Sequence, residues 1–335
     1  MAIVQFRDFN YFYHMHSFHE LHTKFETFFA EHRFPEFPAT LYEPCSYLLN
    51  MGGKRIRPVL CLMSHELFEE IDGNAMNTAM ALELFHNFTL MHDDIMDNSP
   101  LRRGKITVHE KYGTATAILS GDVMNIFAYE HLNKINSQHI HSVIQLFNMT
   151  AIQICEGQQL DMDYEKQQFV TMDQYLQMIT LKTSVLLGAS MKLGAMLGGA
   201  TDGCAGLLYD VGKSLGIAFQ LMDDYLDVYG DSSKTGKQIG GDILSNKKTF
   251  LSTKAHQLAD TSEQAEFISL LSASEINKVK DVVSFYDRKN IREITLAEIN
   301  HYSDHAFELL EKAPILSKRK VHLKSLAESL LNREY

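Results

Sequence analysis

Two acidic motifs carry the residues in this chain that are best suited to chemistry. One reads Asp93-Asp94-Ile95-Met96-Asp97 and the other reads Asp223-Asp224-Tyr225-Leu226-Asp227, and each follows an apolar lead-in. On a helix, positions i and i+4 lie on one face about 6 Å apart. The first and last aspartates of each motif therefore share a face, and the middle aspartates are turned about 100° away from it.

Stacked carboxylates on an apolar helix need a cation to neutralise them. A solvated acidic face is the alternative interpretation, and the apolar lead-ins argue against it. Carboxylate oxygens from two helices suit Mg²⁺, which completes its coordination shell with water and phosphate oxygens. The motifs therefore predict a metal site that takes a phosphate-bearing substrate.

Basic residues follow both motifs. Arg102, Arg103 and Lys105 come after the first, whereas Lys237, Lys247 and Lys248 surround Gly240-Gly241-Asp242 after the second. Upstream, residues 52–58 read Gly-Gly-Lys-Arg-Ile-Arg-Pro, with Lys54 and Arg57 on one helical face. Cations beside glycine backbone bind anions, although each cluster alone is more typical of a solvated surface. Together they predict two anionic sites, one bridged by metal and one held by cations only.

The elements that position these residues are predicted to be helices. Five of the six prolines lie at or before Pro100 and the sixth is Pro314, so the stretch between them can be helical throughout. Apolar residues recur at spacings of three and four along 76–91 and 215–226, and runs of strand type are absent. Breaks are expected at residues 51–54, 98–100 and 229–236. We predict one all-helical domain over residues 1–335, with about ten or more helices.

Composition limits the class of protein. The 335 residues are 45% hydrophobic and 22% charged, which is typical of a soluble core-forming chain, and the net charge of -11 argues against nucleic acid as a partner. No apolar run is long enough to span a membrane, and the N-terminus does not read as a signal peptide. Four cysteines without metal or redox spacing indicate reduced core thiols and a cytoplasmic protein. A histidine-rich stretch near the N-terminus is interpreted as an exposed helix face, with a metal-binding tract as the alternative.

These motifs together resemble the trans-isoprenyl diphosphate synthases, also called polyprenyl synthetases. The resemblance runs from about Gly52 to Lys248 through residues 52–58, the first aspartate motif with Arg102-Arg103-Gly104, Lys182-Thr183, and residues 219–227 with Gly240-Gly241-Asp242. It implies an all-α helical bundle of the isoprenoid synthase type, with a central cavity between the helices that carry the two motifs. The first 50 residues and the tail after about residue 250 carry no usable motif.

The resemblance implies a role for each motif residue. Asp93, Asp97, Asp223 and Asp227 are expected to be the metal-binding residues, with three Mg²⁺ ions in each active site. Asp94, Asp224 and Asp242 would support the metal cluster through waters or cation contacts, Asp227 sharing in this role. Arg102, Lys182, Lys237 and Lys247 would contact the allylic diphosphate. Lys54, Arg57, His86 and Arg103 would hold the diphosphate of isopentenyl diphosphate, and Thr183 and Gln220 would line the reacting carbons.

The expected reaction follows from these charges. Stabilisation of the departing diphosphate leaves an allylic cation, which the double bond of isopentenyl diphosphate attacks before a proton is lost. No motif side chain is an obvious base, and the resemblance makes the departing diphosphate the proton acceptor. For Lys182 and Thr183, simple helix packing is the alternative interpretation. The expected partners are therefore isopentenyl diphosphate and the dimethylallyl, geranyl and farnesyl diphosphates, and the protein is expected to be a homodimer.

Product length is predicted from the helix that precedes Asp93. Phe88 lies roughly 7 Å below the metal site and Phe85 roughly 12 Å below it, at 1.5 Å per residue. A ring at that depth, with the smaller Thr89 beside it, resembles the short-chain enzymes. We predict a C15–C20 product, with geranylgeranyl diphosphate slightly favoured, although both rings are also compatible with ordinary core packing.

Four alternatives compete with this prediction. A His-Asp type metal phosphohydrolase is suggested by His92-Asp93, but the other histidines form no matching motif. A non-catalytic partner subunit usually lacks one aspartate motif, and both are intact here. A terpene cyclase would lack the second triplet and the isopentenyl diphosphate cations. A long-chain polyprenyl synthase would differ mainly in the residues below Asp93.

Overall fold

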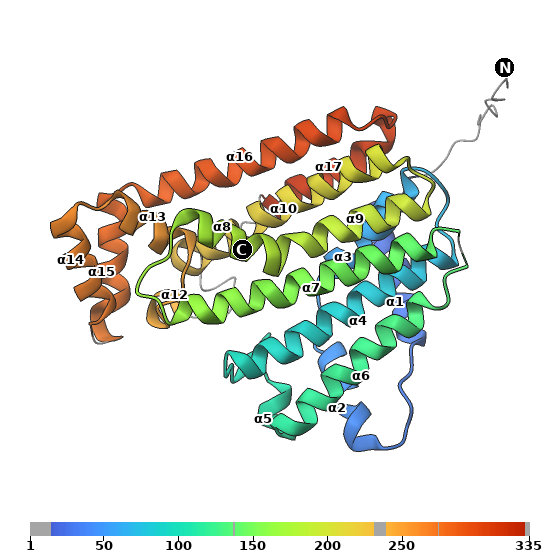
Figure 1. Ribbon diagram of the computed structural model, residues 1–335, viewed down its shortest axis with the longest axis horizontal. Helices are drawn as coiled ribbons and strands as arrows, with labels where there is room; N and C mark the ends of the chain where they lie inside the picture. Colours follow the sequence, from blue (N-terminus) through green and yellow to red (C-terminus); the bar gives the residue numbers. More distant parts are fainter. Residues whose placement is uncertain (1–14, 137, 231–238, 274, 332–335) are drawn as a thin grey trace.

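The computed structural model describes residues 15–136, 138–230, 239–273 and 275–331, and within these ranges the chain is almost entirely helical (Figure 1). The prediction of an all-α fold is confirmed. The elements follow in chain order: α1 (Phe18–Glu31), α2 (Ala39–Leu49), α3 (Ile56–Glu66), α4 (Gly73–Met96), β1 (Leu101–Arg102), β2 (Lys105–Ile106), α5 (Val108–Tyr112), α6 (Thr114–Leu132), α7 (Ile140–Glu165), α8 (Met172–Ile179), the π-helical turn η1 (Thr180–Ser184), α9 (Val185–Leu197), α10 (Asp202–Tyr229), α12 (Gly241–Leu244), α13 (Phe250–Leu258), α14 (Thr261–Leu271), α15 (Glu275–Arg288), α16 (Ile291–Lys312) and α17 (Ser317–Leu331).

The two-residue strands form a hairpin that the sequence patterns did not predict. β1 pairs antiparallel with β2, so that Leu101 faces Ile106 and Arg102 faces Lys105. The turn between them uses Arg103 and Gly104, whose φ angles are 52° and 73°. Two left-handed residues in a row suit the tight turn that matches the twist of paired strands. The turn thus sets the direction in which Arg102 and Arg103 leave the end of α4.

The core is built around α4 and α10. α4 packs against α3, α6 and α9, whereas α10 packs against α9 and α16. Every residue from Thr78 to Phe85 is buried, so this part of α4 is covered on all sides. In Figure 1 both helices run from right to left, so that their C-terminal ends, which carry the acidic motifs, point toward the same end of the bundle.

Local capping determines where these two long helices begin and end. The Asp72 side chain accepts a hydrogen bond from the Ala75 amide at 2.8 Å at the start of α4, and Thr201 caps α10 in the same way. α4 ends at Met96, and Asn98 then takes a left-handed conformation with φ 48° before Pro100. The predicted break at residues 98–100 is therefore confirmed, and each motif occupies the last turns of its helix.

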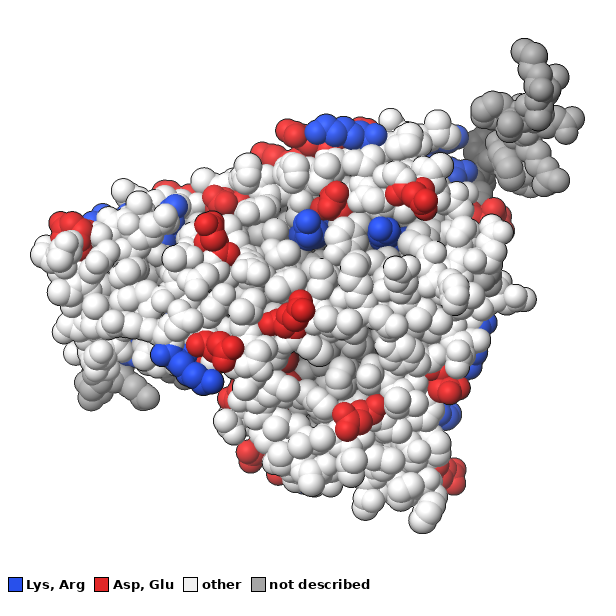
Figure 2. Space-filling view, in the orientation of Figure 1, with Lys and Arg blue, Asp and Glu red and all other residues white. Residues whose placement is uncertain are grey.

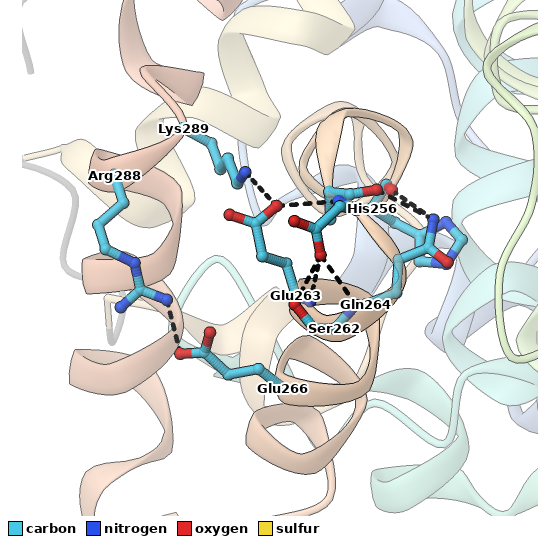
Figure 3. A network of polar contacts seen from close by, with 9 residues as sticks. His256, Ser262, Glu263, Gln264, Glu266, Arg288 and Lys289 are labelled. Atoms are coloured by element: carbon cyan, nitrogen blue, oxygen red, sulfur yellow. Dashed lines mark hydrogen bonds and ion pairs between the residues drawn. The ribbon is translucent and has the colours of Figure 1, made fainter.

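The C-terminal region adds a small lobe of helices at the left of Figure 1. Two ion pairs join α14 to the C-terminal end of α15 and the residue after it: Arg288 to Glu266 at 2.6 Å, and Lys289 to Glu263 (Figure 3). Gln264 donates to the carbonyl groups of His256 and Ala259, which fixes the turn between α13 and α14. Their aromatic core contains Phe267, Phe285 and Tyr286. The tail after residue 250, which carries no sequence motif, therefore folds into helices that these contacts hold together.

Three further expectations can be compared with the fold. No described helix is long and apolar enough to cross a membrane. All four cysteines are free, but Cys155 is exposed, so the expectation of core thiols is wrong for that residue. His16 pairs with buried Glu66 and His32 contacts His131, so these two histidines do not belong to an exposed face. Within the part of the chain that the structure describes, His16 and His32 do not belong to any group of three side chains that could hold a metal ion.

Candidate active site

The first acidic motif occupies the last turn of α4. Asp97 follows the last helical residue, and its amide donates to the Asp93 carbonyl at 2.8 Å, which places the two residues one turn apart on one face. Asp93 is partly buried and Asp97 is exposed. Asp94 points the other way and is only 1% exposed. The predicted separation of the middle aspartate from the other two is therefore observed.

Arg102 folds back onto Asp94. Its Nε and Nη2 atoms each donate to one carboxylate oxygen at 2.8 Å, in a two-pronged contact. Asp94 was expected to support the metal cluster through waters or cation contacts, and the cation that it contacts is Arg102. Because two of the Arg102 donors are used in this way, the hairpin β1–β2 is held against the end of α4.

The second motif has the same division of roles. Asp223 is exposed, Asp227 is partly buried and Asp224 is only 5% exposed. The Asp227 side chain accepts from the Asp242 amide at 3.0 Å, and its carbonyl accepts from the Gly240 amide at 2.7 Å. Asp227 therefore holds the Gly240-Gly241-Asp242 turn over the end of α10. Lys237, which was predicted to contact diphosphate, lies outside the described residues.

Lys182 and Thr183 lie in the π-helical turn η1, which interrupts the helix between α8 and α9. Two glycines on neighbouring helices let their backbones approach this turn. A Cβ atom on Gly157 of α7 would lie 2.3 Å from the Lys182 nitrogen, and one on Gly216 of α10 would lie 2.6 Å from the Ser184 Cα atom. π-Helical turns are frequent at functional sites. Here the turn brings Thr183 within 3.1 Å of the Gln220 Oε1 atom, to which its hydroxyl donates.

Lys182 pairs with Asp161, a residue that the sequence patterns did not single out. The Lys182 Nζ and Asp161 Oδ2 atoms are 2.5 Å apart, and Asp161 is 5% exposed. Burial raises the pKa of Asp93 to about 6; Lys182 opposes this shift, whereas Asp97 and Asp161 add to it. Asp161 therefore joins the same charged group as the first motif. The available signal in the sequence was an acid four residues after Gly157, in the run Gly157-Gln158-Gln159-Leu160-Asp161.

Lys247 connects the two motifs electrostatically. Desolvation lowers its pKa, but Asp242, Asp161, Asp224 and Asp97 act in the opposite direction, so that the pKa is raised above its ordinary value. These carboxylates come from the first motif, from α7 and from the second motif with its following turn. The two motifs lie at the C-terminal ends of α4 and α10, which point toward the same end of the bundle (Figure 1), so both face the same region. Figure 2 shows the surface hollowed between α7 and the α4–α6 pair, with acidic side chains at its edge.

A cationic group lies beside this space. The Arg57 Nη1 atom donates to the His86 Nε2 atom at 3.0 Å. Burial lowers the pKa of His86 well below its ordinary value, and the neighbouring arginines reinforce the shift, so the ring is neutral. The Arg103 guanidinium lies over Gly53, where a Cβ atom would be 3.1 Å from its Nη1 atom. Lys54 is exposed at the start of the same segment. The predicted set of four therefore lies on residues 53–57, α4 and the hairpin turn.

Arg55 belongs to the scaffold beneath this cationic group. It is 4% exposed, and it donates to Glu83 at 2.6 Å and to Glu26 at 2.7 Å. Its guanidinium also lies 4.3 Å from the centre of the Phe29 ring. These contacts neutralise Arg55 within the core, whereas burial lowers the pKa of Arg57 to about 10, with Glu83 and Asp223 opposing that shift.

The phenylalanines before Asp93 form part of an aromatic group. The ring centres of Phe85 and Phe88 are 5.6 Å apart, and Phe85 lies 5.2 Å from Phe147 of α7. Tyr129 of α6 lies 5.4 Å beyond Phe147. Thr89 turns back and donates to the His86 carbonyl at 2.8 Å. The sequence identified only the α4 residues, because Phe147 and Tyr129 reach this group through the packing of α6 and α7.

The donor set fits magnesium in one particular mode. Among the described residues, no three acidic, histidine or cysteine side chains converge closely enough to hold an ion by themselves. Mg²⁺ is commonly bound through one or two carboxylates, with waters and substrate phosphates completing its shell. Asp93, Asp97 and Asp223, which are partly buried or exposed around a shared space, suit that mode. Asp94 and Asp224 do not, because both are buried and bonded to protein donors.

Comparisons with known proteins agree with this geometry. A family model described as polyprenyl synthetase matches residues 38–288. The short chain isoprenyl diphosphate synthase of Methanothermobacter thermautotrophicus is 36% identical over 89% of this chain and 92% of its own length. The geranylgeranyl diphosphate synthase of Saccharolobus solfataricus is 37% identical over 88% of this chain and 90% of its own.

Solved structures are equally similar. A crystal structure of a geranylgeranyl pyrophosphate synthase superposes with a TM-score of 0.90 at 39% identity and covers 96% of this chain and 100% of its own. That of the geranylgeranyl pyrophosphate synthetase from Pyrococcus horikoshii gives a TM-score of 0.88 at 32% identity, covering 95% and 98%. The similarity thus extends over the described helices, well beyond the motifs.

Proposed function

Because the chain belongs to the polyprenyl synthetase family and is a prenyltransferase that makes short-chain prenyl diphosphates, we propose that it builds geranylgeranyl diphosphate from isopentenyl diphosphate and the dimethylallyl, geranyl and farnesyl diphosphates. The single observation that carries the proposal is that α4 and α10 present their acidic motifs at the same end of the bundle. The cationic group beside it supplies the second diphosphate site.

The allylic diphosphate is proposed to lie between α4 and α10. Asp93, Asp97, Asp223 and Asp227 would hold Mg²⁺, three ions in each site, and Asp227 also accepts from the Asp242 amide. Bound Mg²⁺ would neutralise the charge that develops on the departing diphosphate. Lys182 and Lys247 would contact the diphosphate oxygens, and Arg102, which Asp94 holds in place, would join them.

Isopentenyl diphosphate is proposed to occupy the cationic group formed by Lys54, Arg57, His86 and Arg103. His86 accepts from Arg57 through Nε2, so its proton is on Nδ1 and it can donate a hydrogen bond without carrying a charge. The arginines supply the positive charge, and no metal is required there. Because the two diphosphates are bound in different ways, each substrate has its own place and orientation, which favours attack by the double bond on the allylic carbon.

Thr183 and Gln220 are proposed to line the reacting carbons. The Gln220 Oε1 atom and the Thr183 hydroxyl oxygen present negative ends of dipoles near the position where the allylic cation forms. Such dipoles are already oriented before reaction, so they stabilise the cation without reorganisation. The departing diphosphate then accepts the proton, because none of the motif side chains is placed as a base.

A C20 product is supported by the aromatic rings below Asp93 and by the names of the similar proteins. Phe88 and Phe85 would limit the depth, and Phe147 packs edge-on against Phe85. The curated relatives include geranylgeranyl diphosphate synthases from Methanosarcina mazei and Saccharolobus solfataricus. The His-Asp phosphohydrolase alternative gains no support, because the His92 Nε2 atom donates to the Ile118 carbonyl at 3.1 Å on the side facing α6.

We also propose that the protein is a homodimer formed by one helical domain over residues 1–335. Exposed apolar side chains gather on α6 and α7: Ile118, Leu119, Ile126, Met149 and Ile152. Apolar surface of this kind often marks a protein interface. A cytoplasmic location is proposed from the free, buried thiols of Cys45, Cys61 and Cys204.

One experiment tests the proposed function. The protein is incubated with Mg²⁺, isopentenyl diphosphate and each allylic diphosphate in turn, and product lengths are measured. Asp93→Asn and Asp223→Asn should each lose nearly all turnover while retaining the helical fold. Asp210→Asn is the matched control, since Asp210 is an exposed aspartate on α10 away from the motif. Near-normal turnover in either motif variant would refute the shared metal site.

A further inference from the structure

Asp224, the middle aspartate of the second motif, is surrounded by protein donors. Its Oδ2 atom accepts from the Tyr175 hydroxyl at 2.6 Å and from the Phe250 amide at 2.9 Å, and its Oδ1 atom accepts from the Gln220 Nε2 atom at 3.1 Å. Three elements, α8, α10 and α13, therefore meet at one carboxylate. A carboxylate with both oxygens bonded in this way orients side chains inside the protein.

The contacts form a continuous relay from Tyr175 to Thr183. Gln220 donates to Asp224 through Nε2, and its Oε1 atom at the other end of the amide accepts from the Thr183 hydroxyl at 3.1 Å. Gln220 is oriented by its two partners, since its Nε2 atom lies at the Asp224 carboxyl group and its Oε1 atom lies at the Thr183 hydroxyl. If the Gln220 amide turned over, its oxygen would face the Asp224 Oδ1 atom, that atom would lose its donor, and the amide nitrogen would replace the carbonyl oxygen beside Thr183.

Tyr175 is well placed to hold the relay in position. It is 1% exposed on α8, and its ring lies 6.3 Å from that of Phe250. A capping box at Thr171 and Gln174 defines the start of α8 at Met172, three residues before the tyrosine. Its hydroxyl makes the shortest of the three contacts to Asp224. Packing therefore fixes the position of the ring, and the hydrogen bond from its hydroxyl fixes the position of the Asp224 carboxylate.

We propose that Tyr175 is a positioning residue for the condensation reaction, acting through Asp224 to keep the Gln220 carbonyl directed toward the reacting carbons. This inference rests on the proposed role of Gln220 beside the allylic cation. It also assigns Asp224 to orientation, in place of the metal-supporting role that the sequence resemblance implied. Because Tyr175 is buried away from both substrates, we expect it to affect kcat and to leave the affinity for the diphosphates unchanged.

The test is a double-mutant cycle between Tyr175→Phe and Gln220→Leu. Tyr175→Phe keeps the ring and removes the hydroxyl, and we expect kcat to fall about tenfold, within the range that small misplacements cause. KM for both diphosphates and the Mg²⁺ concentration for half-maximal rate should stay within about twofold. The double variant should be no slower than Gln220→Leu alone, because both changes interrupt one relay.

Two further variants separate positioning from stability. Tyr229→Phe is the matched control, since Tyr229 on α10 also donates to an aspartate, Asp287, at 3.3 Å but lies outside the relay; its kcat should be unchanged. Asp224→Asn provides a second route into the relay if Tyr175→Phe is poorly folded. It should lower kcat without changing the Mg²⁺ requirement, whereas Asp223→Asn should raise that requirement.

The outcomes distinguish the two levels of the proposal. If Gln220→Leu turns over at the normal rate, the proposed role of Gln220 fails and this inference fails with it. If Gln220→Leu is impaired but Tyr175→Phe is not, or if the two losses multiply, only the role of Tyr175 is refuted. An increased Mg²⁺ requirement in Asp224→Asn would return that residue to the metal site and would also overturn the inference.

Discussion

Replacing Phe88 with alanine should lengthen the product by one C5 unit. Phe88 is partly buried, with its ring centre 5.6 Å from Phe85 and 4.7 Å from His92. A C5 unit adds about 5 Å of chain at single-bond lengths of about 1.5 Å. Phe85 lies three residues farther along the helix, or about 4.5 Å. Removing the Phe88 ring therefore makes room for about one unit before the chain meets Phe85.

The energetic gain from that extra space is large. Each buried methylene group contributes about 0.8 kcal/mol, so a C5 unit in apolar surroundings gains roughly 3–4 kcal/mol. This is enough to favour a longer product by more than about a hundredfold once the steric block is gone. The C20 product should become mainly C25. The further variant Phe85→Ala on that background should extend it until Phe147 is reached.

The assay separates prenyl products by chain length after incubation with farnesyl diphosphate, isopentenyl diphosphate and Mg²⁺. Phe127→Ala is the matched control, because Phe127 is a partly buried ring on α6 that packs against Phe34 and His32 on another side of the bundle. It should lower stability without altering product length. An unchanged product distribution in a folded Phe88→Ala protein would show that the floor of the pocket lies on other helices.

Three further predictions follow from contacts in and around the site. Arg55→Ala should destabilise the fold by about 3–5 kcal/mol in urea unfolding, because it leaves the buried Glu83 carboxylate without its partner; Arg57→Ala should mainly raise KM for isopentenyl diphosphate, and the reverse pattern would contradict their assignment. Gly157→Ala should reduce turnover by about a hundredfold, because its Cβ would press on the π-helical turn; Gly206→Ala, which meets no atom within 4 Å, is the control, and equal rates for the two would refute the argument. Burial, together with Lys134 and His32, lowers the pKa of His131 to about 3, so its contribution to stability is present above the unfolded pKa near 6.5 and is lost as pH falls toward 3. His131→Asn should therefore remove up to about 2 kcal/mol of the stability difference between pH 7 and pH 5, whereas exposed His19→Asn should leave that difference unchanged; an unaltered difference in His131→Asn would disprove it.

Much of the site could be predicted because the relevant information is local. Helical periodicity places Asp93 and Asp97 on one face and turns Asp94 away, and a hydrogen bond between the two residues confirms the turn. Proline placement indicated the helical class, and Asn98 and Pro100 marked the end of α4. These features depend on residues within one or two turns of each other, so the order of side chains is sufficient to predict them.

Contacts between distant segments could not be predicted from helical periodicity or proline placement. Asp161 and Phe147 reach Lys182 and Phe85 from α7, and Tyr175 reaches Asp224 across 49 positions of sequence. The residue types around Arg55 and Arg57 do not show that Arg55 forms buried ion pairs, whereas Arg57 is proposed to face a diphosphate. The hairpin at Arg103 and Gly104 was missed because two-residue strands have no periodicity.

The sequence by itself therefore determined the helical class, the acidic motifs and the face that each aspartate occupies, because helix geometry relates these directly to spacing. Only the tertiary structure decided which charged side chains are paired inside the protein and which ones are left to bind substrate. Asp94, Asp224 and Arg55 are used internally, since each is buried against a specific partner. That partition depends on how α4, α7, α8 and α10 pack, and packing joins residues that are far apart in the chain.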